Sequence, residues 1–382
     1  MTDHPPKKYH FICIPYLNLN DQHKEFDFGF AKIWNFDAKQ NEYIKDSVLL
    51  QKLQQTFASY KAHFGIVRGV GIILVGQNDF RELNNEEIKA ANDARLILFI
   101  SHIARANTFV RNMNTAHSVV SSENYDKMHF AIVPEQEYIT IYGGFVSPGI
   151  HGGVKIEENI TIRPWHIPTP GNFYLDEDLM KELIKLRAKK KQLFRKIISA
   201  IEIFFEGYHN STQISHNARI LLQTSAFETL LDTATGEGRK GLKDFIKKHA
   251  NYPEDRVLSY KSERKNGLVF ERGTVKEKWA DRFFTLRNHI SHGYVPKANE
   301  YLFGSWQRHF DIALFFFIFC IKRKMEEILK RDIFNDDVVW KSWTDDLQTT
   351  PVEYTGFEYD GYGRRGWERT MAKINKRKKK II

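Results

Sequence analysis

The chain changes character at a proline-rich segment, and this change constrains the fold more than any other feature. Residues 163–171 (RPWHIPTPG) contain three prolines within seven positions, and proline interrupts both helices and central strands. Before this segment, apolar and polar residues alternate over short runs; after it, apolar residues recur every three to four positions over long runs. We therefore predict an α+β fold, with a strand-rich domain at residues 1–170 and a helical bundle at residues 171–335.

Individual elements follow from the same periodicities. In the first half we predict strands over residues 10–14, 26–30, 65–76, 127–133, 137–142 and 154–163, with helices over residues 48–60 and 85–105. In the second half we predict helices over residues 176–208, 212–234, 241–249, 274–292 and 298–331. Residues 336–382 have no sustained period and form an aromatic and basic C-terminal extension.

Composition limits the class of protein. A length of 382 residues with 42% hydrophobic content is enough for two packed cores. Cys13 and Cys320 are the only cysteines, which excludes a disulfide framework and a four-cysteine zinc site and suggests a reducing cytoplasm. The histidines form no His-Glu-x-x-His pattern, so we expect neither a metal nor a cofactor. The apolar run at residues 312–321 has about half the roughly 20 residues that span a bilayer, so we expect a buried helix, no membrane span and no secretory signal.

The polar residues that could carry chemistry gather at residues 286–293 (LRNHISHG), at the end of one predicted helix. Thr274 and Glu277 fit a capping box that starts this helix. Gly293 is the type of residue that often ends one. One apolar stripe runs between them, formed by Val275, Trp279, Phe283, Leu286 and Ile290.

Asn288, Ser291 and His292 point away from that stripe, and Arg287 lies at its edge. Phe284 also lies on the polar side, which indicates that this side is covered. Arg287 and His292 are roughly 140° apart around a regular helix and would not converge on one atom. Either the last turn unwinds, or two copies of the helix meet. His289, at the other edge of the stripe, is expected to pack or to cap the helix.

The order arginine, asparagine, three residues, histidine resembles the Arg-(four to six residues)-His signature of the HEPN superfamily, a group of helical ribonucleases and nucleotide-binding domains. The asparagine and the trailing glycine resemble the Apea-like branch, which occurs in bacterial anti-phage defence. Residues 218–222 (ARILL) and 225–231 (SAFETLL) are similar to an earlier helix of that branch, in which Glu228 stands within an apolar run. The resemblance covers about residues 175–335 and says little about the first 170.

This resemblance implies a HEPN-like helical domain that forms a homodimer, with an active cleft built by two protomers. It also implies a metal-independent RNA endonuclease that acts in abortive infection on tRNA or another structured RNA. His292 would transfer protons, Arg287 would clamp the phosphate, and Asn288 would orient the imidazole of His292 or the phosphate. Glu228 and Ser291 would support them, with Glu228 paired to Arg287 or, alternatively, to Arg219 or Arg282.

The distribution of basic residues along the chain predicts two regions that would contact RNA. Of the net +10, residues 361–382 carry +8, from nine Lys/Arg and one Glu. The run formed by Lys376, Arg377, Lys378, Lys379 and Lys380 would bind RNA phosphates or serve as a solubilising end. A basic stretch at residues 185–196 would flank an RNA path or form a solvated face.

In the ribonuclease interpretation, the strand-rich domain senses a phage-derived trigger or restrains the nuclease. Two further interpretations remain open. In one, the HEPN-like module is catalytically silent and binds RNA or nucleotide and a protein partner. In the other, the chain is a helical scaffold with a merely polar helix end.

Overall fold

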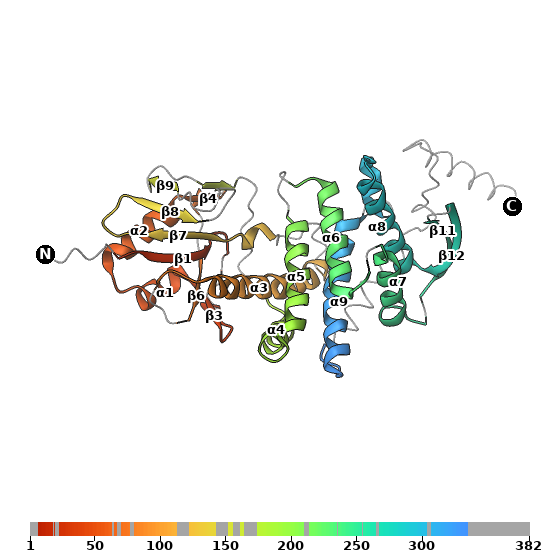
Figure 1. Cartoon of the computed structure of the whole chain (residues 1–382), viewed down its shortest axis with the longest axis horizontal. Coiled ribbons are helices and arrows are strands. Elements are labelled where there is room, and N and C mark those ends of the chain that lie inside the picture. Colours follow the sequence, from red (N-terminus) through yellow and green to blue (C-terminus); the bar gives the residue numbers. More distant parts are fainter. Residues whose placement is uncertain are drawn as a thin grey trace. The chain divides into compact units, whose positions relative to one another are not determined.

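The structure is a computed structural model that describes residues 7–17, 19, 23–62, 65–66, 70–76, 80–112, 122–142, 152–155, 161–163, 174–209, 214–234, 236–253, 255–264, 267–303 and 307–334. The contacts between Cα atoms divide the chain into two compact units, Met1–Thr212 and Gln213–Ile382. The α+β class with a strand-rich first half is confirmed (Figure 1). None of the described helices is long and apolar enough to cross a membrane.

The first unit is organised around an antiparallel sheet of seven strands in the order β2-β3-β6-β1-β7-β8-β9. A smaller sheet pairs β10 with β4 and β4 with β5. The strands are β1 (Tyr9–Ile14), β2 (Glu25–Asp27), β3 (Ala31–Asn35), β4 (Tyr60–Ala62), β5 (Gly65–Ile66), β6 (Gly71–Val75), β7 (Met128–Ile132), β8 (Tyr138–Tyr142), β9 (Gly152–Lys155) and β10 (Thr161–Arg163).

Helices cover both faces of the large sheet. On one face, α1 (Phe36–Tyr43) and α2 (Ser47–Ala58) bury a core with Phe11, Trp34 and Phe130. Alternate residues of the same strands point to the other face, where α3 (Asn85–Asn112) packs on β3 and β6. The sheet is therefore buried on both faces.

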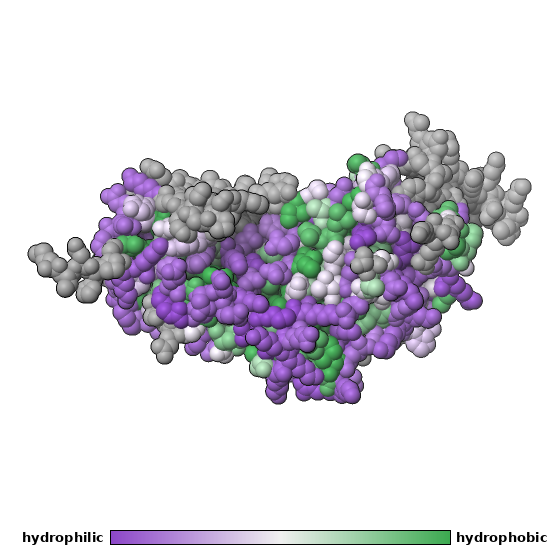
Figure 2. All heavy atoms as spheres, in the orientation of Figure 1, coloured by the Kyte–Doolittle hydropathy of each residue, from purple (hydrophilic) through white to green (hydrophobic). Residues whose placement is uncertain are grey.

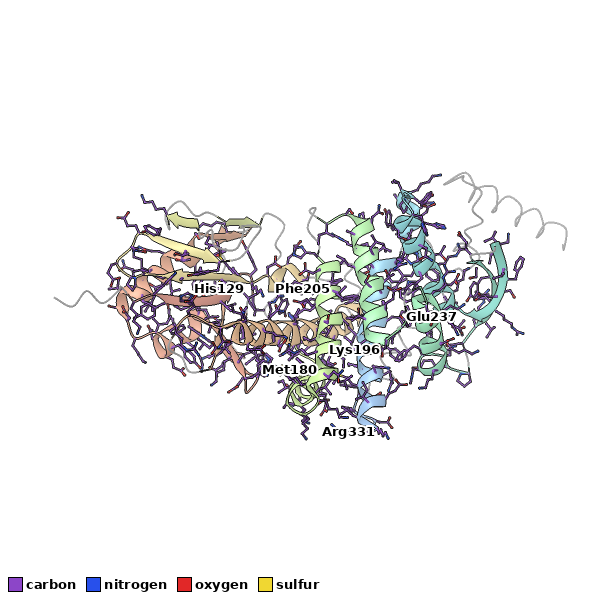
Figure 3. All side chains as sticks on the ribbon, viewed as in Figure 1. His129, Met180, Lys196, Phe205, Glu237 and Arg331 are labelled. Carbon is purple, nitrogen blue, oxygen red and sulfur yellow. The ribbon has the colours of Figure 1, made fainter. Side chains whose placement is uncertain are left out.

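Two further helices pack on α3 within the first unit. They are α4 (Glu177–Lys189) and α5 (Lys191–Gly207), separated by a break at Lys190, whose φ of −137° and ψ of 64° are not helical. Phe205, labelled in Figure 3, contacts Phe99 of α3 edge to face at 4.9 Å between ring centroids. The single long helix predicted over residues 176–208 is therefore wrong. The proline-rich segment predicted as a boundary falls largely outside the described residues, and the compact units divide after Thr212.

A buried carboxylate fixes α4 and α5 on α3. Asp93 of α3 is 2% exposed and accepts from Arg187 Nε at 2.9 Å and from Arg195 Nη1 at 2.7 Å. Part of the basic stretch at residues 185–196 is thus engaged in internal ion pairs.

Asp93→Ala should lower the free energy of unfolding by about 3 kcal/mol, because it leaves two arginines facing a partly buried site without their partner. Urea denaturation measures the change. Glu177→Ala is the matched control: it removes the exposed pair with Lys181 and should cost less than about 0.5 kcal/mol. Equal effects of the two substitutions would contradict a structural role for Asp93.

A second ion pair ties the end of α5 to the short helix η1 (Ser122–Tyr125). His209 is 14% exposed at its side chain, with Nδ1 3.0 Å from Glu123 Oε1 and Nε2 3.3 Å from Asp126 Oδ1. Burial lowers the pKa of His209, but the two carboxylates outweigh it and raise this pKa to about 9. His209 is therefore protonated in the folded protein at neutral pH.

Because the folded pKa lies above the unfolded value, the stabilisation from His209 is complete below about pH 6.5 and is lost as the pH rises towards 9. The stability difference between wild type and His209→Gln should therefore be largest near pH 6 and shrink steadily up to pH 9. Urea unfolding at a series of pH values tests this. A difference that stays constant with pH would rule out the charged pair.

The second unit is a helical core with two small hairpins. Its helices are α6 (His216–Leu231), α7 (Gly238–His249), α8 (Val275–Ser291) and α9 (His309–Leu329). Phe227 of α6 contacts Trp279 and Phe283 of α8 and Phe317 of α9, with ring centroids 5.5–6.4 Å apart. Every residue of the apolar run 312–321 is buried except Phe315, which is partly exposed, so the predicted buried helix is confirmed.

Between α7 and α8 lies a hairpin that the helical periodicity did not predict. Strands β11 (Val257–Arg264) and β12 (Gly267–Thr274) pair antiparallel over their whole length. A second, shorter hairpin of β13 (Leu302–Phe303) and β14 (Gln307–Arg308) follows the short helix η3 (Ala298–Tyr301) and precedes α9. The predicted helix over residues 298–331 therefore begins later, at His309.

The strand predicted over residues 26–30 ends early, because β2 stops at Asp27. Gly29 has a φ of +77° and donates its backbone N–H to Asp27 Oδ1 at 2.7 Å, which turns the chain between β2 and β3. Alternating phenylalanines at positions 26, 28 and 30 thus belong to a hairpin turn and its flanks. The C-terminal extension from residue 336 lies outside the described residues.

Candidate functional site

Helix α8 begins and ends as its sequence predicts. Thr274 Oγ1 accepts from the backbone N–H of Glu277 at 3.3 Å, and Glu277 Oε1 accepts from the backbone N–H of Thr274 at 3.3 Å, which completes the capping box. The stripe from Val275 to Ile290 is buried. The capping box and the apolar stripe are therefore confirmed.

The other end of α8 closes in a Schellman motif. Gly293, with a φ of +85°, donates to Ile290 O at 3.0 Å, and Tyr294 donates to His289 O at 3.0 Å. The rings of His289 and Tyr294 meet edge to face at 5.6 Å. His292 is the C-cap, and its φ of −95° and ψ of 15° depart from the helical values. The backbone thus leaves the helix at His292.

The end of α8 lines a pocket of about 510 Å³. Arg287, Asn288 and His292 all contribute to its wall, so one chain brings the three predicted catalytic residues to one cavity. Helix α8 stays regular up to Ser291, and the backbone N–H of His292 still donates to Asn288 O at 3.1 Å. The last turn is therefore not unwound, and the meeting of two helices stays a prediction. The remaining lining residues come from α6 (Glu228), from residues 236–240, from β11 (Glu263), and from α8 itself (Phe284, Thr285 and His289).

Arg287 is held by two neighbours. Its Nη2 lies 3.7 Å from Glu228 Oε2, and its Nη1 donates to Asn288 Oδ1 at 3.1 Å. The side chain of Arg287 is 27% exposed, and the side chain of Glu228 is 20% exposed. Among the partners that the sequence allowed for Glu228, the structure therefore selects Arg287.

The two histidines of the motif differ in their surroundings. His292 is exposed, and its side chain makes no hydrogen bond or ion pair with any part of the chain that the structure describes. His289 is partly buried, and its Nε2 lies 2.8 Å from Glu263 Oε2. His289 thus packs on Tyr294, one of the two roles expected for it, and in addition forms part of the pocket wall, which the sequence did not indicate.

The start of α7 forms another part of the wall. Its N-cap, Glu237 (Figure 3), makes no side-chain capping bond, so the first N–H groups of this helix are not capped by that residue. Free N–H groups and the helix dipole at an N-terminus favour an anion. Arg239 and Lys240 add positive charge beside it, while Glu228, Glu237 and Glu263 supply three carboxylates. The pocket is therefore lined by both cationic and acidic side chains.

Gly238 allows this close approach of α7 to α6 and α8. A Cβ at this position would lie 2.5 Å from Glu228 Cγ and 2.6 Å from Phe284 Cε1. Phe284 is 2% exposed, so the cover expected over the polar side of α8 is supplied in part by α7 of the same chain.

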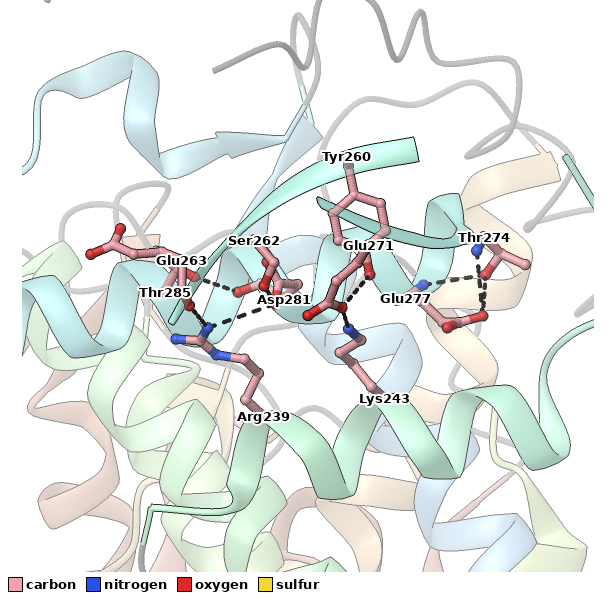
Figure 4. A network of polar contacts seen from close by, with 10 residues as sticks. All are labelled: Arg239, Lys243, Tyr260, Ser262, Glu263, Glu271, Thr274, Glu277, Asp281 and Thr285. Carbon is pink, nitrogen blue, oxygen red and sulfur yellow. Dashed lines mark hydrogen bonds and ion pairs between the residues drawn. The ribbon is translucent and has the colours of Figure 1, made fainter. Parts of the chain in front are cut away.

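A polar network beside the pocket fixes the hairpin against α7 and α8 (Figure 4). The buried Asp281 of α8 accepts from Ser262 Oγ at 2.7 Å and lies 3.8 Å from Arg239 Nη1. Arg239 also donates to the backbone carbonyl of Glu263, and Lys243 forms an ion pair with Glu271. Glu263, which belongs to the hairpin, is thereby positioned at the pocket.

Several sequence predictions meet the structure differently. The helix expected from residue 241 begins at Gly238 because a chain turn at Gly236, with a φ of +86°, comes first. The glycine-rich and basic run at residues 236–240 (GEGRK) is the sequence feature that could have indicated this part of the pocket.

Ser291 lies outside the pocket lining and donates its Oγ to Asn288 O at 2.9 Å. The basic run at residues 376–380 falls outside the described residues.

Two negative findings complete the description. Within the described ranges, no three His, Cys, Asp or Glu side chains gather closely enough to hold a metal ion. Comparisons with protein families, with curated proteins and with solved structures found no significant match to the chain.

Gly238→Ala should destabilise the protein by about 1–3 kcal/mol, because the added methyl group overlaps Glu228 and Phe284. Chemical denaturation measures the loss. Gly236→Ala is the control: no atom lies within 4 Å of its Cβ position, so only its positive φ costs about 1 kcal/mol. A Gly238→Ala protein as stable as wild type would show that α7 does not contact the two helices this closely.

Proposed function

We propose that the chain is a metal-independent RNA endonuclease of the HEPN type that acts in bacterial anti-phage defence by abortive infection. The observation that carries the proposal is that Arg287, Asn288 and His292 line one pocket together with the N-terminus of α7. In this proposal His292 transfers protons, Arg287 binds the phosphate, and the positive end of the α7 dipole supports the bound anion.

The chemistry requires two proton transfers and stabilisation of charge. The ribose 2′-oxygen attacks the adjacent phosphorus, a bond forms between them, and the bond to the 5′-oxygen breaks. The proton of the 2′-hydroxyl goes to a base, and the departing 5′-oxygen receives a proton from an acid. The products are a 2′,3′-cyclic phosphate and a 5′-hydroxyl.

The residues of the pocket suit these tasks. His292 is exposed at the helix end and can exchange a proton with substrate. The contacts of Arg287 with Glu228 and Asn288 fix its orientation and leave guanidinium donors for phosphoryl oxygens. Asn288 acts through Arg287, which it contacts directly. Ser291, bonded to the carbonyl of Asn288, supports that turn.

The wider biological role rests on the resemblance of residues 175–335 to the Apea-like HEPN branch. On that basis the substrate is tRNA or another structured RNA, the helical domain forms a homodimer, and the strand-rich region responds to a phage-derived trigger. The basic run at residues 376–380 would add non-specific contacts to phosphates. The compartment would be the cytoplasm.

One observation favours a second candidate function. Three carboxylates line the pocket beside its three cations, and Arg287 is already engaged by Glu228. A pocket of about 510 Å³ is large enough for a nucleotide. The alternative is therefore a catalytically silent HEPN module that binds RNA or nucleotide and a protein partner.

The test is cleavage of total tRNA by the purified full-length protein in the presence of EDTA. We expect cleavage with 2′,3′-cyclic phosphate and 5′-hydroxyl ends. His292→Ala and Arg287→Ala should each lower the rate by about 100-fold or more, because they remove the proton-transfer group and the phosphate clamp. Both side chains lie at least partly exposed, so both variants should fold.

His216→Ala and Arg331→Ala are matched controls, since each removes the same side-chain type from an exposed position of the second unit outside the pocket. They should cleave at the wild-type rate. Cleavage that EDTA abolishes and Mg²⁺ restores, or full activity of His292→Ala, would refute the proposed mechanism. Nucleotide binding without any cleavage would favour the silent module.

A further inference from the structure

The hairpin of β11 and β12 presents an apolar face that the described part of the chain does not cover. Phe270 is 77% exposed, Leu268 is 68% exposed and Val257 is 51% exposed. Figure 2 shows hydrophobic surface at the hairpin, at the right-hand edge of the view. A solvated strand face normally carries polar side chains, so an exposed phenylalanine in the middle of a strand requires an explanation.

The strand register shows which residues share this face. Phe270 is the cross-strand partner of Lys261, and Arg272 is the partner of Ser259. Side chains of one face alternate with those of the other, and the alternate set, Tyr260, Ser262 and Glu271, makes the contacts with α7 and α8. Phe270, Lys261 and Arg272 therefore lie together on the outer face, and by the same alternation Glu263, paired with His289, lies on this face at the end of β11 nearest the pocket.

The outer face combines an aromatic ring with positive charge. Lys261 Nζ lies 5.9 Å from the centroid of the Phe270 ring, and Arg272, two residues further along β12, is exposed. Aromatic rings flanked by cations are the usual surface on which proteins stack unpaired bases while they hold the phosphates. A purely apolar protein partner would not need the two cations.

The same hairpin leads directly to the pocket. Glu263 lines the pocket, and its cross-strand partner in the hairpin is Leu268. Phe270 follows two residues after Leu268, a distance of about 7 Å along a strand. A strand of RNA whose scissile phosphate lies in the pocket can therefore reach Phe270 with a neighbouring nucleotide.

We propose that the outer face of this hairpin is a binding surface for single-stranded RNA, with a base stacked on Phe270 and phosphates held by Lys261 and Arg272. This inference rests on the proposed ribonuclease function and extends it: the cleaved RNA is unpaired beside the scissile phosphate. The hairpin selects loops or ends of a structured RNA over its duplex parts.

The experiment measures binding of a fluorescent 12-nucleotide 2′-O-methyl oligouridylate to the full-length protein by anisotropy. The probe lacks the 2′-hydroxyl nucleophile, so binding is measured without cleavage. Phe270→Ala should weaken binding by about 5- to 100-fold, the usual worth of one stacked base, and Phe270→Trp should restore it. Phe270→Leu keeps the apolar character without the aromatic face and should bind as weakly as Phe270→Ala.

Charge is tested separately through the salt dependence. Lys261→Ala and Arg272→Ala should each reduce the slope of log affinity against log salt by about 1. Tyr138→Ala and Lys89→Ala are the controls, because they remove an exposed aromatic ring and an exposed cation from the first unit. A probe of the same length without bases should bind wild type and Phe270→Ala equally.

The outcomes separate this inference from the proposed function. Unchanged affinity of Phe270→Ala, or wild-type affinity of Phe270→Leu, overturns the stacking surface even if His292-dependent cleavage is found. A fall in molecular mass of Phe270→Ala by light scattering would assign the face to a second copy of the chain and would also overturn it. Binding that depends on Phe270 in a protein that cleaves nothing would support the surface and refute the ribonuclease.

Discussion

The burial of helix α8 on nearly all of its sides is the constraint on which the second unit depends. Its apolar stripe packs against α6 and α9, while charged residues on its other sides are buried as well. A buried charge needs a partner, and for Lys276 and Asp281 the partners come from neighbouring segments of the chain. Lys276 pairs with Asp255 at 2.8 Å, and Asp281 binds the hairpin and α7. These contacts determine where α7 and the hairpin lie around α8.

The pocket exists because α8 stops. The Schellman motif at Gly293 turns the backbone away from the helix axis. The space that a further turn of helix would fill is therefore left as a cavity, which Arg287 and His292 line. The start of α7 faces this cavity, and Gly238 lets the two helices approach closely. Cationic and acidic groups therefore surround the same space.

The first unit is organised around a sheet, whereas the second is organised around helix α8. Its sheet is buried on both faces by helices, and its buried charges, Asp93 and His209, hold helices α4 and α5 to α3 and η1. Basic residues that could have formed an RNA path are in part committed to these contacts. An exposed patch that combines aromatic and basic residues is found instead on the hairpin of the second unit, next to the pocket.

The sequence by itself determined the mixed fold class, the limits of α8, its apolar stripe and the polar cluster at its end. Those features are local, because capping and periodicity act within a few residues. Only the tertiary structure decided that Glu228 meets Arg287, that His289 and Glu263 join the pocket, and that α7 begins at Gly238 beside it. The hairpin of β11 and β12 was missed because each of its faces carries both apolar and polar residues, which hides the alternation of a half-solvated strand. Contacts between residues far apart in the chain depend on packing, and no local pattern records them.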